Sequence, residues 1–120
     1  MELSEFEEAV EKALNKVPEK FRVILKKEGI PVLAREEVPD VLQDRYKGSL
    51  LFGIFTGVSY NRRSMFNFQT EPTRIELYKN SFEQAFSNRN EMEEQIVKTV
   101  IHEIGHYFGF SEEELRRRKL

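Results

Sequence analysis

The two histidines of this 120-residue chain lie four positions apart around a glutamate, in the stretch His102-Glu103-Ile104-Gly105-His106. Four residues make about one turn of a helix, so both imidazoles project from the same face. Two imidazoles at this spacing are typical metal ligands, and the carboxylate between them can reach a metal-bound water. The motif therefore predicts a helix that carries a zinc site suited to hydrolysis.

The motif lies within the longest predicted helix, which runs from Asn90 to about Phe108, with Asn90 and Glu93 expected to cap its start. Both histidines border a broad apolar face of this helix, which places a metal between the core and a cleft. The apolar face consists of Ile96, Val97, Val100, Ile101, Ile104 and Phe108.

Length and composition indicate a single domain over residues 1–120. A charged content of 33% with a net charge of only −2 gives no electrostatic reason to expect a nucleic acid or a membrane as the main partner. The absence of cysteine excludes disulfides, thiolate ligands and a cysteine nucleophile. The start of the chain is acidic, and no segment approaches the roughly 20 apolar residues of a membrane span, so we expect a cytoplasmic protein. The sequence predicts no particular oligomeric state.

The remaining pattern predicts an α+β fold in which a short mixed sheet packs against helices. Helices are expected over about residues 5–16 after a Ser4–Glu7 capping box, from Pro18 to Gly29, and from Asn80-Ser81 to Phe86. Strands are expected over residues 30–35, 50–57 and 73–78, a helical turn over 39–46, and an irregular loop over 61–64.

A catalytic zinc site usually has three protein ligands and a water in the open position, and His102 and His106 supply two of the ligands. The metal lowers the pKa of the water toward ~7. Glu103 is expected to take the proton of that water and pass it to the leaving amine. Its role is therefore predicted to be that of general base and not of ligand.

Glu112 is the candidate third ligand. Gly109 is expected to end the helix in a left-handed conformation and to turn the chain back beneath the metal. Glu112 follows three residues later and completes the pattern H-E-x-x-H-x-x-G-x-x-E. The alternative is that Glu112 only adds an acidic residue to the first turn of a helix capped by Ser111 and Glu114.

The stretch from His102 to Leu115 resembles the metzincin peptidases, which carry a third histidine where this chain has Glu112. It resembles more closely a family of small bacterial zincin-like metallopeptidases, which have a similar length, a minimal zincin fold and an acidic third ligand, usually aspartate. The segments 51–58 and 74–78 are also similar to that family. The resemblance implies a zinc peptidase that acts on peptides or proteins. Other divalent ions are alternatives to zinc, because ligands of this kind accept several.

Several secondary candidates accompany the motif. Such peptidases usually bind substrate as an extra strand at a sheet edge, and residues 74–78 are the candidate edge, or else a purely structural strand. Gly105 is either a tolerated helix glycine, at a cost of about 1 kcal/mol, or a position where a side chain would crowd a neighbouring strand. The basic tail 116–119 is expected to be a solvated helix end. Candidate oxyanion donors are Tyr60, Tyr78, Tyr107 and Arg74.

The leading functional hypothesis is hydrolysis of peptide bonds by a metal-activated water. The main alternative is a non-catalytic zinc-binding or interaction module that keeps the zincin fold. A third hypothesis is a regulatory peptidase resembling those that cleave bacterial repressors, which would draw its third carboxylate from a separate helix. A fourth is a metal-dependent endoribonuclease of the rRNA-maturation type, although that family has a glycine where this chain has Glu103.

Overall fold

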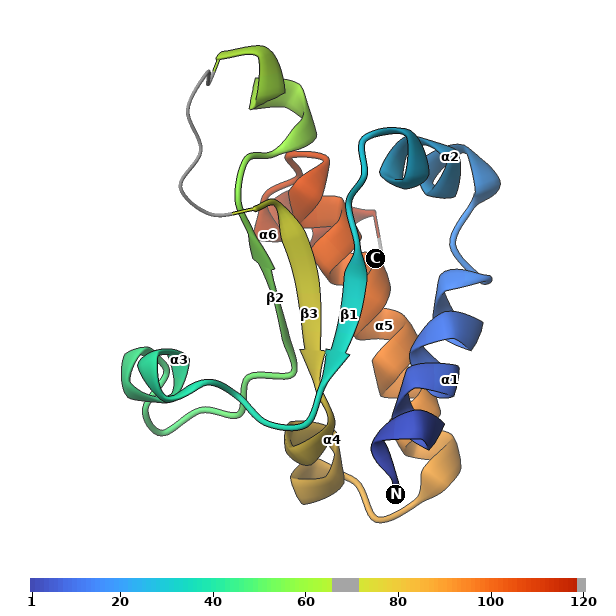
Figure 1. The fold of residues 1–120 in the computed structure, drawn as a ribbon, viewed down its shortest axis with the longest axis vertical. Coiled ribbons are helices and arrows are strands. Elements are labelled where there is room, and N and C mark those ends of the chain that lie inside the picture. Colours follow the sequence, from blue (N-terminus) through green and yellow to red (C-terminus); the bar gives the residue numbers. More distant parts are fainter. Residues whose placement is uncertain (66–71, 119–120) are drawn as a thin grey trace.

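The computed structural model describes residues 1–65 and 72–118, without the side chains of residues 63–65. It confirms the predicted α+β fold (Figure 1). The elements in chain order are α1 (Leu3–Leu14), α2 (Glu19–Lys27), β1 (Val32–Arg35), α3 (Asp40–Arg45), β2 (Gly53–Thr56), the 3-10 helix η1 (Tyr60–Met65), β3 (Arg74–Tyr78), α4 (Lys79–Ala85), α5 (Arg89–Tyr107) and α6 (Glu112–Arg117).

The three strands form one mixed sheet in the order β1-β3-β2. β1 runs parallel to β3, with Val32 opposite Ile75, whereas β2 runs antiparallel to it, with Gly53 opposite Leu77. The expectation that residues 74–78 form a sheet edge is therefore wrong. β3 lies in the centre because both its neighbours pair with it, and β1 and β2 are the edges of the described sheet.

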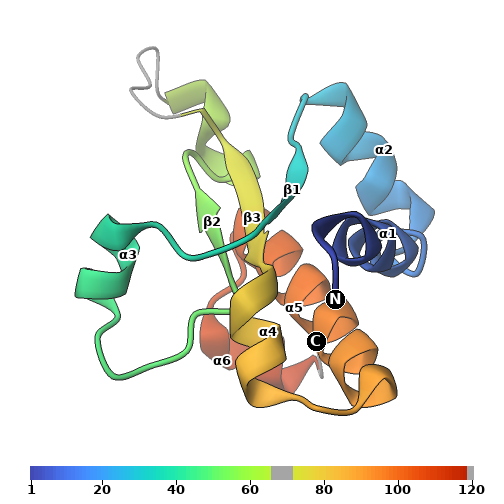
Figure 2. The same ribbon diagram turned by 60° about the horizontal axis from the view of Figure 1, so that its bottom comes forward.

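The hydrophobic core lies between one face of the sheet and the helices α1 and α5, which pack against each other (Figures 1 and 2). Alternation along β3 turns Ile75 and Leu77 into this core. Glu76 lies on the opposite face, where Arg35 and Arg74 donate hydrogen bonds to its carboxylate at 3.0 and 2.8 Å. The helix α5 is thus held between the sheet and α1.

The helices α1 and α5 are capped by residues other than the expected ones. α1 begins earlier, because Leu3 joins its apolar side and Glu2 and Glu5 form the capping box in place of Ser4 and Glu7. α5 is capped by Asn88, whose side chain accepts a hydrogen bond from the backbone of Glu91. Asn88 lies in a run of polar residues in which several side chains are suitable caps.

Two further local expectations are also corrected. β3 continues directly into α4 at Lys79, so Asn80 and Ser81 do not cap that helix. Residues 61–64 belong to the 3-10 helix η1 and not to an irregular loop. The expected helical turn over 39–46 is confirmed as α3, and none of the described helices is long and apolar enough to cross a membrane.

Candidate metal centre

His102 and His106 lie one turn apart near the carboxyl end of α5. Their ring centroids are 4.8 Å apart and their planes are nearly perpendicular, at 87°. The side chains are 33% and 25% exposed, so both rings are accessible from solvent while their stems are packed. The predicted placement of two imidazoles on one accessible helix face is confirmed.

A tight turn follows His106 and reverses the chain. The backbone N–H of Gly109 donates to the carbonyl of His106 at 2.9 Å, and that of Phe110 donates to the carbonyl of Gly105 at 3.0 Å. This pair of bonds is the Schellman pattern, which requires a left-handed residue, and Gly109 has φ of 92°. A Cβ at Gly109 would also approach the side chain of Asn61 to 2.7 Å.

The turn carries Glu112 back to the histidines. Its Oε1 lies 3.0 Å from Nε2 of His102 and 2.8 Å from Nε2 of His106. Glu112 is the first residue of α6, whereas Ser111 and Glu114 form the capping box of that helix. The two alternatives for Glu112 are therefore compatible, because the cap uses neighbouring side chains and leaves its carboxylate free to face the imidazoles.

The hydrogen-bond geometry around His106 is compatible with metal binding. Nδ1 of His106 lies 3.2 Å from the carbonyl of Phe110, which can only accept, so a ring protonated at Nδ1 donates to that carbonyl. In this tautomer the lone pair of Nε2 faces the carboxylate of Glu112 at 2.8 Å, and a metal ion can bind both atoms. A ring protonated at Nε2 donates to the same carboxylate instead. The hydrogen bond with His102 also lowers the pKa of Glu112, which keeps the carboxylate ionised.

The spacing of the three donor atoms also fits zinc. Bonds of about 2.0–2.1 Å in a tetrahedral site place neighbouring donors about 3.3 Å apart. The donor atoms of His102, His106 and Glu112 all lie within 4.8 Å of one another. The carboxylate oxygen of Glu112 lies 2.8–3.0 Å from both Nε2 atoms, close to that spacing, whereas the two imidazoles have to turn toward each other to reach it. No other group of three such side chains occurs in the described part of the chain.

Glu103 lies beside this cluster but not in it. Its carboxylate accepts a hydrogen bond from the backbone N–H of Phe55 in β2. Burial raises the pKa of Glu103 above its usual value, and the histidines at 106 and 102, together with that hydrogen bond, oppose the rise. Glu103 is thus held at the side of the metal cluster that faces the sheet edge.

A cavity of about 420 Å³ opens next to Glu103, between β2 and α5. Gly53 lets the two elements approach closely, because a Cβ there would lie 2.9 Å from the carbonyl of Glu76 and 3.1 Å from Thr99. The cavity is lined by Phe52, Gly53, Gln95, Lys98, Thr99, His102 and Glu103. Neither Lys98 nor Phe52 was predicted from the sequence as a site residue. Gly53, a glycine inside a predicted strand, was the local signal that another segment approaches the strand closely.

The family model for zincin-like metallopeptidases matches residues 28–120 of the chain. The chain belongs to this family. The matched region of the zincin-like metallopeptidase runs from β1 to α6 and includes the whole metal cluster, whereas α1 and α2 precede it. A search of curated proteins found no significant match. Membership confirms the resemblance noted from the sequence, and it supports metal-dependent peptide hydrolysis, with zinc, as the general class of activity.

Two of the expected oxyanion donors of this zincin-like chain lie on the wrong side of the sheet. Arg74 and Tyr78 alternate with the core residues of β3 and therefore share the face opposite α5. Arg74 donates to Glu76 at 2.8 Å. Tyr78 is fully buried, and burial raises its pKa to about 12. Neither side chain points toward the metal cluster.

The other two tyrosines lie in an aromatic group beside the turn. Tyr107 is buried and its ring contacts Phe55 at 5.9 Å between centroids. Tyr60 contacts Tyr107 and Phe108 at 6.1 and 5.4 Å. These contacts support the carboxyl end of α5, and they assign no oxyanion donor.

Gly105 is needed for helix packing, but against a helix and not a strand. A Cβ there would collide with Cδ2 of Leu115 in α6. Leu115 is fully buried, so it has little room to move. The close approach of α5 and α6 at this point places the first residue of α6, Glu112, within reach of the histidines.

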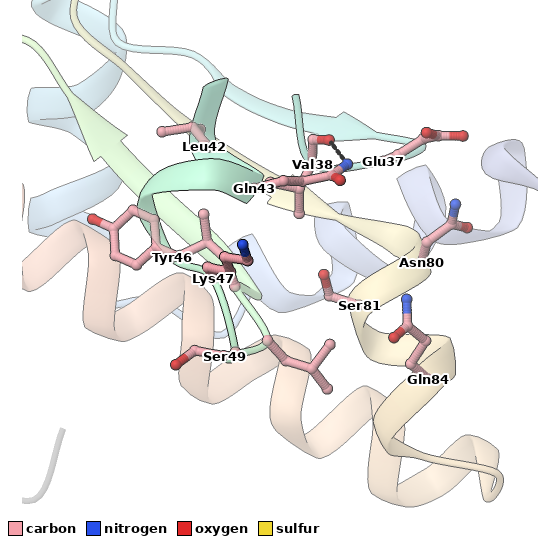
Figure 3. A pocket seen from close by; sticks show the side chains of 13 residues that line it. Glu37, Val38, Leu42, Gln43, Tyr46, Lys47, Ser49, Asn80, Ser81 and Gln84 are labelled. Atoms are coloured by element: carbon pink, nitrogen blue, oxygen red, sulfur yellow. Dashed lines mark hydrogen bonds between the residues drawn. The ribbon is translucent and has the colours of Figure 1, made fainter. Parts of the chain in front are cut away.

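A second cavity, of about 350 Å³, lies between α3 and the start of α4 (Figure 3). Asn80, Ser81 and Gln84 line it from α4. Gln43 and Val38 also line it, and the side chain of Gln43 donates a hydrogen bond to the carbonyl of Val38 at 2.6 Å. Its lining contains neither a histidine nor a pair of carboxylates. The metal cluster is therefore the stronger functional candidate.

Proposed function

We propose that the chain is a zinc-dependent peptidase in which His102, His106 and Glu112 bind the metal and Glu103 is the general base. One observation carries the proposal: a single carboxylate oxygen of Glu112 faces both imidazoles at 2.8–3.0 Å, while Glu103 is held aside by the backbone of Phe55. Hydrolysis at a zinc site requires three metal ligands and a separate general base, and these residues match the two roles.

When bound, the metal supplies a Lewis acid and a water of lowered pKa. Glu103 accepts the proton of the attacking water and then donates it to the leaving amine. The N–H of Phe55 interacts with the carboxylate of Glu103 and helps to orient it. The carbonyl of Phe110 fixes the ring of His106 in the same way.

The substrate is proposed to bind along the open edge of β2. The carbonyl of Phe52 accepts from the N–H of Tyr78, so it points toward β3. Alternation in an antiparallel ladder then turns the backbone groups of Gly53 and Phe55 away from β3, toward the open edge. The N–H of Phe55 is engaged by Glu103, which leaves the carbonyl of Phe55 and both groups of Gly53 to pair with a peptide.

The other hypotheses have less support. Glu112 already lies at the histidines, so a third carboxylate from a separate helix, as in the regulatory peptidases, is not needed. Glu103 lies beside the cluster as the peptidase mechanism requires, which disfavours the ribonuclease. The non-catalytic zinc module keeps the same ligands and differs only in having no activity, so experiment must separate it.

The test is to replace Glu103 with alanine and to measure zinc content and peptide hydrolysis together. We expect the variant to retain stoichiometric zinc and to lose activity by a factor of about 10² to 10⁴. Glu113→Ala, which removes an exposed carboxylate outside the cluster, is the matched control and should retain both. Full activity in Glu103→Ala would exclude Glu103 as the base, whereas zinc-loaded wild type that cleaves no peptide of a broad library would favour the non-catalytic module.

A further inference from the structure

The cavity beside Glu103 is lined by a lysine that the mechanism does not use. Lys98 lines the cavity, is exposed, and makes no ion pair with any described residue. Gln95 and His102 lie three residues before it and four residues after it, so the three side chains share one stripe of α5. A lone ammonium group therefore lies one helical turn from the metal ligand, in the cavity that the general base also lines.

The strand β2 and the helix α5 run side by side in the same direction. Gly53 packs against Thr99, and Phe55 binds Glu103. Two strand residues span about 6.6 Å and four helix residues span about 6 Å, so the two elements stay in step over this distance. Consider a peptide that pairs with β2 and places its reacting bond at Glu103. The peptide residue two positions from that bond then lies beside Gly53 and next to Lys98.

We propose that this cavity is a substrate subsite that selects a carboxylate, with Lys98 as the residue that determines specificity. The inference rests on the proposed peptidase function and names the substrate class. The carboxylate is an aspartate or glutamate side chain, or the carboxyl end of the peptide, two positions from the reacting bond. Gln95 supplies a neutral amide donor on the same stripe, and Phe52 supplies an apolar wall for the aliphatic stem.

The neighbouring groups limit the preference to that position. The other charged side chain in the cavity lining is Glu103, which lies toward the metal and repels a carboxylate placed at the reacting bond itself. The hydroxyl of Thr99 donates to the carbonyl of Gln95 at 2.8 Å, so its proton is already used. Lys98 is therefore the dominant attraction for an acidic group, and it acts beside Gly53.

The test compares zinc-loaded wild type with Lys98→Glu on peptides that differ only in having Glu, Gln or Lys two positions from the cleaved bond. We expect wild type to prefer Glu over Lys by about tenfold in kcat/KM, and Lys98→Glu to reverse the order. Lys16→Glu makes the same change of charge in the turn after α1, outside this cavity, and should keep the wild-type order. An unchanged Glu-to-Lys ratio in Lys98→Glu would overturn the proposal.

Peptides with free and amidated carboxyl ends distinguish the two sources of the carboxylate. A preference that survives amidation identifies an acidic side chain, and one that disappears identifies the chain end; both depend on Lys98. Fluorescence anisotropy of the same peptides with Glu103→Ala and with Glu103→Ala/Lys98→Glu measures binding without hydrolysis. If wild type cleaves nothing, the peptidase proposal fails. The subsite is still supported if Glu103→Ala binds the Glu peptide more tightly than Glu103→Ala/Lys98→Glu does. Equal binding of the Glu peptide to both variants rejects the subsite.

Discussion

Nδ1 of His106 lies 3.2 Å from the carbonyl of Phe110, so the backbone just beyond the helix orients the ring of a metal-ligand candidate. The turn that aligns these two residues depends on Gly109, whose φ is 92°. The same turn brings Glu112 to 2.8 Å from the other ring nitrogen. One glycine thus sets both the orientation of an imidazole and the position of a carboxylate.

Replacement of Gly109 by alanine is therefore expected to weaken zinc binding by about 10- to 100-fold, the usual effect of disturbing the groups that orient ligands. The new Cβ would meet Asn61 in addition to the strain of the left-handed backbone. Gly48→Ala is the matched control, because Gly48 has φ of 86° with open space around it. Competitive zinc titration checks the prediction; equal affinities for the two variants would contradict it.

Gly105→Ala is expected to destabilise the metal-free protein by about 1–3 kcal/mol, despite the better helix propensity of alanine, because its Cβ collides with Leu115. Leu115→Ala alone is expected to cost about 2–5 kcal/mol, since the side chain is fully buried. The double variant should cost less than the sum of the two, because the cavity at 115 accepts the new methyl group. Urea unfolding measures all three, and strict additivity would show that the two residues do not share this contact.

The buried ammonium of Lys79 predicts a pH dependence of stability. It forms ion pairs with Glu36 at 2.8 Å and Glu83 at 2.7 Å. The hydrogen bond from Lys79 lowers the pKa of Glu83 below its ordinary value of 4.5. Because the folded pKa is the lower one, the stabilisation is present above pH 4.5 and is lost as the pH falls through the folded value.

Glu83→Gln should therefore flatten the decline in the free energy of unfolding on the acid side of pH 4.5. Glu8→Gln removes an exposed carboxylate of α1 that has no ion pair among the described residues, and it should leave the decline unchanged. Urea unfolding at several pH values is the measurement. The same pH profile for Glu83→Gln and wild type would show that the Lys79 pair does not contribute.

Tyr78→Phe is expected to leave stability unchanged or to raise it by up to about 1 kcal/mol. The hydroxyl of Tyr78 is buried and has no hydrogen-bond partner among the residues that the structure describes, so its removal relieves a desolvation cost. Because the side chain lies on the sheet face opposite α5, peptidase activity should also be unchanged. Thermal unfolding and an activity assay check both statements. A loss of activity would contradict the placement of Tyr78 away from the site and would make it an oxyanion-donor candidate again.

The metal cluster could be predicted from sequence because its parts are local. His102, His106 and Glu112 lie within eleven residues, and helical spacing, a left-handed glycine and a capped short helix fix their relation. Each of these rules acts over one or two turns. The structure brings the three side chains together as the pattern predicted, and the metal itself stays a prediction.

The surroundings of the cluster could not be predicted, because they depend on contacts between distant segments. Alternation in residues 74–78 describes a strand buried on one face, but it does not distinguish a central strand from an edge. The order β1-β3-β2 follows from pairing between strands separated by up to about 40 residues. The contacts of Phe55 with Glu103 and of Gly53 with Thr99 likewise join segments that no local pattern connects.

The most direct test of the account is a zinc titration of the metal-free wild type, Glu112→Ala and Glu113→Ala, with affinity measured by competition with a chelating dye. Both glutamates lie in the first turn of α6, so the two variants change the charge of that helix equally. We predict that Glu113→Ala binds stoichiometric zinc as tightly as wild type and that Glu112→Ala binds at least about tenfold more weakly. Equal affinities for wild type and Glu112→Ala would contradict the assignment of Glu112 as the third ligand.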